Sequence, residues 1–241
     1  MVNVSRHDDL DALVTTAATR LTELLSSIHN APDGGVHGDG RARIVLTGGG
    51  SGIALLNALV ERDIDWSRVE VFFGDERNVP VSDAESNEGQ ARDALLDKIS
   101  IPTDNIHGYG LDGGDMTDQV LAYERTIDDV APRGFDVHLL GMGGEGHINS
   151  LFPHTSAVAE NERLVVAVTD SPKPPAERAT LTLAAVTRAD HVWLLVSGAE
   201  KAEAAAKVAH GADARDWPAA GAIGRVETVL FVTDDATTHI D

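Results

Sequence analysis

Short apolar segments that alternate with helical patterns are the feature that most limits how this chain can fold. The segments are rich in Val, Ile, Leu and Phe, and we predict strands at Ala42–Thr47, Val69–Phe73, Phe135–Leu140, Leu164–Val168, His191–Ser197 and Thr228–Thr233. Helical spacing of apolar residues predicts helices at Leu10–Ile28, Ser51–Val60, Asn87–Ile99, Met116–Val130 and Ala199–Ala209. This alternation predicts an α/β, Rossmann-like fold, in which a mainly parallel sheet carries helices on both faces.

The length of 241 residues suits one large α/β domain. No internal repeat or long linker interrupts the chain, so we expect a single domain over residues 1–241, with room for a small subdomain around Asn87–Asp129. Two segments are rich in Gly or Pro and are predicted to be loops, His29–Gly40 and Ser171–Pro175.

Composition and charge exclude several classes of function. The chain has no cysteine, so disulfides, thiolate metal sites and a cysteine nucleophile are excluded. A net charge of -20 repels phosphate backbones, so we expect no nucleic-acid partner. The polar start of the chain lacks the apolar core of a signal peptide, and no apolar run approaches the ~20 residues that span a bilayer. We therefore expect a cytoplasmic protein without membrane contact.

Ligands of open parallel sheets bind beyond the carboxyl ends of the strands, so the residues that follow each strand matter most. After the first strand, residues 47–52 form a glycine-rich turn into a helix. The backbone N–H groups of Gly49, Gly50 and Ser51 are candidates for binding phosphate. The turn is equally compatible with a purely structural strand–helix connection, and it is not a Walker A loop, because no Gly-Lys-Ser/Thr follows.

Charged residues come directly after the second strand. Asp75, Glu76 and Arg77 are hard to explain by packing at this position, and we predict that Asp75 and Arg77 belong to a functional site. The alternative is a solvated turn held by ion pairs.

A histidine follows the third strand. Residues 141–146 match G-x-G-x-x-G, but Pro153 leaves room for barely two helical turns, which argues against dinucleotide binding. His147, beside Glu145, is a candidate general base, because imidazole has an ordinary pKa of ~6.5. Judged alone, His147 is equally compatible with a histidine that packs against a short helix. We expect most of the other histidines to lie at the surface. No spacing typical of a metal site is present, so we expect no metal.

Basic residues follow the fourth and fifth strands. Lys173 and Arg178 flank a proline-rich stretch that limits their mobility. Lys201 falls in the first turn of a predicted helix, where a cation gains nothing from the helix dipole, and this hints at a ligand. Together with Arg77, these residues can supply the local positive charge that an anionic substrate requires.

These segments together resemble the 6-phosphogluconolactonase family, which shares a fold with glucosamine-6-phosphate deaminases. The likeness runs from Ile44 to the end of the chain. It rests on the glycine-serine turn, on residues 73–77 with 79–80 and 86–87, on residues 141–143 with 146–147 and 150–153, on residues 173–175 with 178 and 180, and on residues 197–198 with 201. Two positions differ: Glu145 stands where the family commonly has Asp, and Gly50-Ser51-Gly52 stands where it often has Ser-Thr-Pro.

The resemblance implies hydrolysis of 6-phospho-D-glucono-1,5-lactone to 6-phospho-D-gluconate in the oxidative pentose phosphate pathway, without a cofactor. The substrate would be a small sugar-phosphate lactone, and the protein a monomer or weak homo-oligomer. His147 would activate water as a general base. Arg77 would stabilise the oxyanion or orient the sugar acid, and Asp75 would hold Arg77 or His147. The substrate phosphate would rest on the residues Gly49, Gly50, Ser51, Arg178 and Lys201.

Two other functions remain open from the sequence. A glucosamine-6-phosphate deaminase/isomerase would end its histidine motif in Asn-Glu-Pro, whereas residues 150–153 here are Ser-Leu-Phe-Pro and lack that acid. A non-catalytic sugar-phosphate sensor usually carries a DNA-binding domain, and this sequence shows no helix-turn-helix segment.

Overall fold

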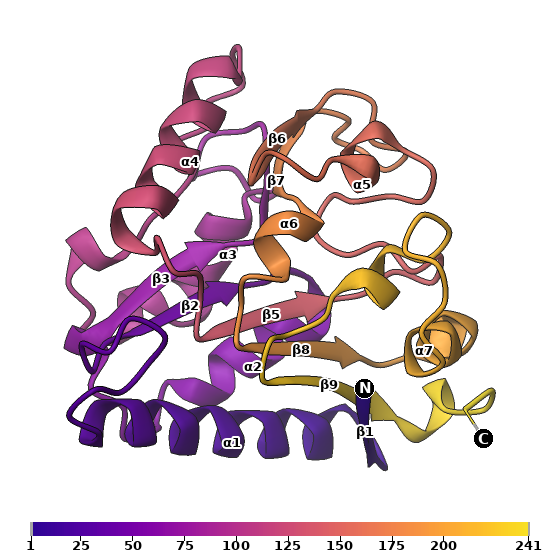
Figure 1. The fold of residues 1–241 in the computed structure, drawn as a ribbon, viewed down its shortest axis with the longest axis horizontal. Helices are drawn as coiled ribbons and strands as arrows, with labels where there is room; N and C mark the ends of the chain where they lie inside the picture. Colours follow the sequence, from indigo (N-terminus) through magenta and orange to yellow (C-terminus); the bar gives the residue numbers. More distant parts are fainter. Residues whose placement is uncertain (1, 241) are drawn as a thin grey trace.

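A six-stranded parallel sheet forms the centre of the computed structural model, which describes residues 2–240. The strand order is β1-β9-β8-β5-β2-β3 (Figure 1). The strands are β1 Val2–His7, β2 Ala42–Leu46, β3 Val69–Phe73, β5 Val137–Gly141, β8 His191–Val196 and β9 Glu227–Thr233. All residues of β2 and β3 are buried, as expected for parallel strands that are covered on both faces. The predicted α/β fold with a mainly parallel sheet is confirmed.

Helices lie on both sides of this sheet. They are α1 Leu10–Asn30, α2 Gly49–Leu59, α3 Asn87–Ala94, α4 Thr117–Val130 and α7 Ala202–Ala209, with one-turn helices α5 Ser156–Ala159 and α6 Leu183–Val186. In Figure 1, α1 runs beneath the main sheet and contacts α2, while α4, α5 and α6 lie above the sheet. The Asp9 carboxylate caps α1 by accepting a hydrogen bond from the Ala12 N–H at 2.9 Å.

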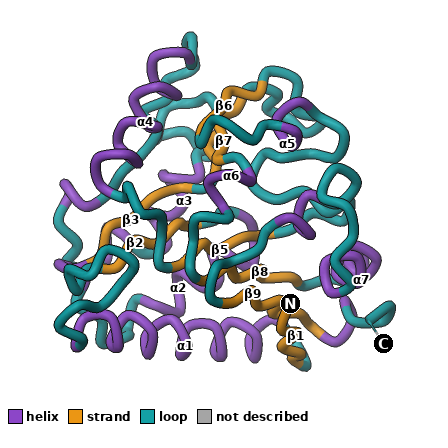
Figure 2. Tube along the Cα trace, in the orientation of Figure 1, coloured by secondary structure: helices purple, strands orange, loops and turns teal. Residues whose placement is uncertain are grey.

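A second, antiparallel sheet corrects the predicted place of one strand. It contains β4 Asp75–Arg77, β7 Arg178–Leu181 and β6 Val165–Val168, in the order β4-β7-β6, and lies above the main sheet (Figure 2). The fourth predicted strand, Leu164–Val168, is therefore β6 of this small sheet and not part of the parallel sheet. Periodicity predicted a strand there correctly but carried no information about its partner.

The small sheet also contains two strands that the sequence did not predict. Asp75–Arg77 pairs with Arg178–Thr180, so the charged residues after β3 form β4 and the basic residue after the proline-rich loop begins β7. Neither strand shows an apolar run in the sequence, because β4 has three charged residues and β7 has only four residues, of which two are polar. Strand β1 was also missed, because it is a partly exposed edge strand with polar residues.

Three further predictions need adjustment. The predicted helix Asn87–Ile99 ends at Ala94, and a 3-10 turn follows at Leu96–Lys98. The predicted helix Ala199–Ala209 starts with a 3-10 turn, so Lys201 is the residue that precedes α7 and does not lie within its first turn. The segment after His147 is a tight turn with a bridge between Ile148 and Leu151, so no helix begins there.

Candidate active site

One cleft at the carboxyl edge of the main sheet contains the eight residues for which the sequence predicts a catalytic or binding role. The turns after β2, β3, β5 and β8 meet there, with residues of α3 and β7. The cleft is lined by Thr47, Gly48, Gly49, Gly50, Ser51, Gly52, Asp75, Arg77, Asn87, Gly141, Met142, His147, Asn149, Arg178, Leu195 and Lys201. The structure therefore brings together His147, Arg77, Asp75, Gly49, Gly50, Ser51, Arg178 and Lys201, while the role of each remains a prediction.

The glycine-rich turn points the amino end of α2 at the cleft. Gly48 precedes the helix, and its lack of a side chain leaves the first N–H groups without a side-chain acceptor. Gly49 has a φ of +77°, a left-handed conformation that other residues rarely adopt, and a Cβ at Gly49 or Gly50 would project into open space. The free N–H groups and the helix dipole make this end of α2 a suitable place for a phosphate.

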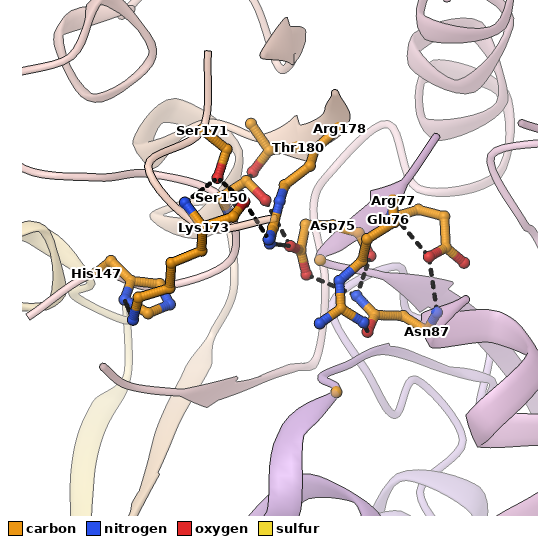
Figure 3. A network of polar contacts seen from close by, with 12 residues as sticks. Asp75, Glu76, Arg77, Asn87, His147, Ser150, Ser171, Lys173, Arg178 and Thr180 are labelled. Carbon is orange, nitrogen blue, oxygen red and sulfur yellow. Dashed lines mark hydrogen bonds and ion pairs between the residues drawn. The ribbon is translucent and has the colours of Figure 1, made fainter. Parts of the chain in front are cut away.

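Asp75 is buried and holds together several parts of the cleft. Its Oδ2 accepts a hydrogen bond of 2.6 Å from Ser150 Oγ, and its Oδ1 accepts one of 3.0 Å from Asn87 Nδ2. Arg178 approaches the same carboxylate at 3.9 Å (Figure 3). Asp75 thus links β4, α3, β7 and the turn that carries the histidine.

Glu76 has a structural task that the sequence did not reveal. The residue is 3% exposed, and its carboxylate accepts hydrogen bonds from Ser86 Oγ and from the N–H groups of Arg77, Asn87 and Glu88 at 2.7–2.9 Å. Burial raises the pKa of Glu76, and these hydrogen bonds oppose that rise. Glu76 therefore caps the amino end of α3 and fixes the segment that supplies Asn87.

Arg77 is held in the cleft by Asn87. Its NH1 donates to Asn87 Oδ1 and to the Glu85 carbonyl, both at 2.8 Å, while its buried Nε has no partner within residues 2–240 (Figure 3). Asp75 therefore reaches Arg77 only through Asn87. A Cβ on Gly48 would lie 2.4 Å from Asn87 Oδ1, so glycine is required where the glycine-rich turn contacts the Asn87 amide.

His147 lies at the opposite part of the cleft, stacked on Phe152 at a centroid distance of 4.6 Å. Its Nδ1 lies 3.1 Å from Glu145 Oε1, and Lys173 Nζ lies 2.9 Å from the same oxygen. A carboxylate only accepts, so a proton on Nδ1 would face Glu145 and would leave Nε2 as the basic nitrogen. Burial, with the nearby Lys173 charge, lowers the pKa of His147 below its ordinary value. Gly143 makes room for the ring, because a Cβ there would lie 2.0 Å from Nδ1.

Arg178 is less free than the sequence suggested. Its side chain is 6% exposed, and it donates to the carbonyls of Lys173, Pro174 and Pro175 at 3.0–3.2 Å. These bonds fix the proline-rich loop and leave NH1 nearest to Asp75. The structure shows that Arg178 holds the proline-rich loop in place. A contact between Arg178 and the substrate phosphate stays a prediction.

Lys201 enters the cleft from the turn after β8. Within residues 2–240, no acidic side chain lies within 4.0 Å of its ammonium. It is therefore available to an anion that binds at the amino end of α2.

Sequence reasoning passed over three residues that shape this site. The sequence predicts Asn87 only as the first residue of a helix, assigns no role to Glu145, and indicates Lys173 only as a source of positive charge. The only sign of a role for Glu145 in the sequence is its position two residues before His147. The contact of Lys173 with that pair depends on the fold.

Two further findings concern the described residues only. Within residues 2–240, no cluster of three His, Asp or Glu side chains is arranged to hold a metal ion. No helix in this part of the chain combines the length and the apolar character that crossing a membrane demands.

Comparison with known proteins places the chain in a family. The profile of the family described as glucosamine-6-phosphate isomerases/6-phosphogluconolactonase matches residues 8–231. The chain belongs to this family. It is 49% identical to a 6-phosphogluconolactonase of Mycobacterium tuberculosis, over 96% of each chain.

Solved structures of the family share the fold. A 6-phosphogluconolactonase of Thermotoga maritima superposes with a TM-score of 0.85 at 25% identity, covering 97% of this chain and 100% of that one. A monomeric glucosamine-6-phosphate deaminase has a TM-score of 0.83 at 20% identity, covering 99% and 100%. The fold alone therefore does not separate the two activities of the family.

Proposed function

We propose that this protein is a lactonase that hydrolyses 6-phospho-D-glucono-1,5-lactone to 6-phospho-D-gluconate, as part of the oxidative pentose phosphate pathway. The observation that carries the proposal is a half-buried histidine, with Glu145 beside its Nδ1, that shares a cleft with an open helix amino end. The first feature suits activation of water, and the second suits a phosphate. The relatives that are 6-phosphogluconolactonases and cover nearly the whole chain support this choice of substrate.

The phosphate binds at the amino end of α2. The N–H groups of Gly49, Gly50 and Ser51 donate to its oxygens, and Lys201 with Arg178 adds positive charge. This local positive charge lets an anionic substrate bind to a protein whose overall charge is -20. Anchored there, the substrate extends its lactone ring toward His147.

His147 acts as a general base in the first step. Its Nε2 takes a proton from water while the water oxygen bonds to the lactone carbonyl carbon, and the carbonyl electrons move onto oxygen. Arg77, whose Nε has no other partner within residues 2–240, stabilises that oxyanion or orients the sugar acid. Asp75 positions Arg77 through Asn87.

The second step opens the ring. The bond between the carbonyl carbon and the ring oxygen breaks, and the ring oxygen takes the proton that His147 holds. His147 returns to its neutral form, and the product is the open sugar acid. Water is the only co-reactant, and one base contributes typically ~10²–10⁴-fold to such a reaction.

The deaminase activity of the family fits this cleft less well. Ring opening of an amino sugar would call for an acid that works with the histidine, and the turn after His147 offers Ser150, Leu151 and Phe152. Phe152 lies against the imidazole face, so an apolar ring occupies the surroundings of the base.

A coupled assay tests the substrate. Freshly prepared 6-phosphogluconolactone is given to the purified protein, and 6-phosphogluconate formation is followed against uncatalysed hydrolysis. Glucosamine-6-phosphate is assayed in parallel. We expect the protein to accelerate hydrolysis of the lactone and to leave glucosamine-6-phosphate unchanged. Turnover of glucosamine-6-phosphate alone would identify a deaminase. Binding of either compound without turnover would identify a sensor.

Other expectations from the sequence stay predictions. These are a single domain over residues 1–241, a cytoplasmic location, a monomeric or weakly homo-oligomeric state, and independence from cofactors, metals and nucleic acid.

A further inference from the structure

Three charged or titratable side chains meet at the mouth of the cleft. Lys173 Nζ lies 2.9 Å from Glu145 Oε1 and 3.4 Å from His147 Nδ1, and Glu145 Oε1 lies 3.1 Å from the same Nδ1 (Figure 3 shows Lys173 beside the imidazole). One carboxylate oxygen thus lies close to both the ammonium and the imidazole nitrogen. The ammonium also lies 6.0 Å from the centre of the Phe152 ring, on which His147 stacks.

The backbone that presents Lys173 is held firmly. The Lys173 carbonyl accepts hydrogen bonds from Arg178 NH2 at 3.1 Å and from Ser171 Oγ at 3.0 Å. Arg178 is itself buried beside Asp75, and two prolines follow Lys173 directly. The loop therefore holds the main chain of Lys173 beside the imidazole, and the ammonium lies against Glu145.

We propose that Lys173 is a positioning residue for the base: its ammonium holds Glu145 in place for His147 Nδ1 and disfavours protonation of the imidazole. The inference rests on the proposed role of His147. A carboxylate alone next to a histidine stabilises the imidazolium, which cannot accept a proton from water. The ammonium cancels much of that effect while leaving the Glu145 carboxylate beside Nδ1.

The surrounding charges agree with this assignment. The groups that act on His147 are Glu145 on its own loop, Lys173 on the proline-rich loop and Asp75 on β4; Arg178 on β7 lies 6.0 Å from the Phe152 ring. Burial and Lys173 lower the pKa of His147, whereas both carboxylates raise it. Hydrogen bonding to Lys173 and nearby positive charge outweigh burial and lower the pKa of Glu145, so the carboxylate stays ionised as an acceptor.

The test removes the charge and keeps the length of the side chain. Lys173→Met is compared with Lys173→Arg, which keeps the charge, and with Lys98→Met, which removes a lysine from a different hollow beside Trp66. Two readouts are taken: the pH profile of kcat/KM for the lactone, and an NMR titration of the His147 ring in the enzyme without substrate. The resonance of His147 is assigned with a His147→Gln variant.

We expect Lys173→Met to move the acidic limb of kcat/KM and the NMR midpoint of His147 upward by roughly half to one pH unit, since a unit charge at this distance in a watery medium shifts a pKa by about one unit. Lys173→Arg and Lys98→Met should change neither the acidic limb of kcat/KM nor the NMR midpoint of His147. A Lys173→Met enzyme whose limb and midpoint are unchanged, even with a lower kcat, would overturn the proposal. If the wild-type protein does not hydrolyse the lactone, the proposed function fails, and the NMR midpoint still decides the effect of Lys173.

Discussion

His138 gives a prediction whose size can be worked out from the structure. It lies in the middle of the main sheet on β5, between Val45 of β2 and Val192 of β8, and is fully buried. Neither ring nitrogen has a partner within residues 2–240, and the ring meets Phe135 edge-on at 6.1 Å. Burial lowers the pKa of His138 to about 3 from an ordinary 6.5. The folded protein therefore holds this histidine neutral.

The lowered pKa makes stability depend on pH. Between about pH 6.5 and pH 3, the unfolded chain binds a proton at His138 that the folded protein does not, so the free energy of unfolding falls as the pH falls through this window. The slope approaches about 1.4 kcal/mol per pH unit, and the loss between pH 7 and pH 5 comes to about 2 kcal/mol. In wild-type protein this loss adds to that from other titrating groups.

The variant His138→Leu isolates this contribution. Leucine does not titrate and leaves no polar atom unpartnered, so we expect equal or greater stability at pH 7 and an advantage over wild type that is about 2 kcal/mol larger at pH 5. Urea unfolding followed by circular dichroism at the two pH values measures the difference. A stability difference that is the same at both pH values would refute the reasoning, because His138 would then be protonated equally in the folded and unfolded chains.

Two other substitutions probe the capping carboxylate and the proposed phosphate site. Glu76→Gln replaces an acceptor of hydrogen bonds from Ser86 and the start of α3 by an amide, and should lower the free energy of unfolding by roughly 2–3 kcal/mol in urea melts; stability equal to wild type would contradict the capping role. Lys201→Ala should raise KM for the lactone roughly ten- to a hundredfold with kcat nearly unchanged, measured in steady state with Lys207→Ala as the control. A lower kcat at unchanged KM would remove Lys201 from the phosphate site.

The main sheet was predictable because its strands are short and largely apolar. Val69–Phe73 and Val192–Val196 are buried, and that burial leaves a strong apolar signal in the sequence. The same reasoning failed for β4, where Asp75-Glu76-Arg77 is paired with a strand about a hundred residues later. Its charged side chains are satisfied by Ser150, by α3 and by Asn87, and none of these partners is visible locally.

The convergence of the site residues in one cleft was predictable, and the contacts among their side chains were not. Residues that follow parallel strands meet at one edge, so the convergence of the glycine turn, Arg77, His147 and Lys201 follows from topology. The division of labour between Asp75 and Glu145 depends on side-chain directions. In the structure, Glu145 lies beside His147, whereas Asp75 contacts Asn87, Ser150 and Arg178.

The central claim is that His147 is the base that activates water for lactone hydrolysis. The most direct measurement is kcat and KM for 6-phosphogluconolactone in wild type, His147→Ala and His147→Gln, each corrected for uncatalysed hydrolysis and each shown to be folded. We predict that kcat falls about 10²–10⁴-fold in both variants, while KM changes little, because the phosphate site is untouched. A His147→Ala enzyme that keeps near-wild-type kcat would contradict the claim.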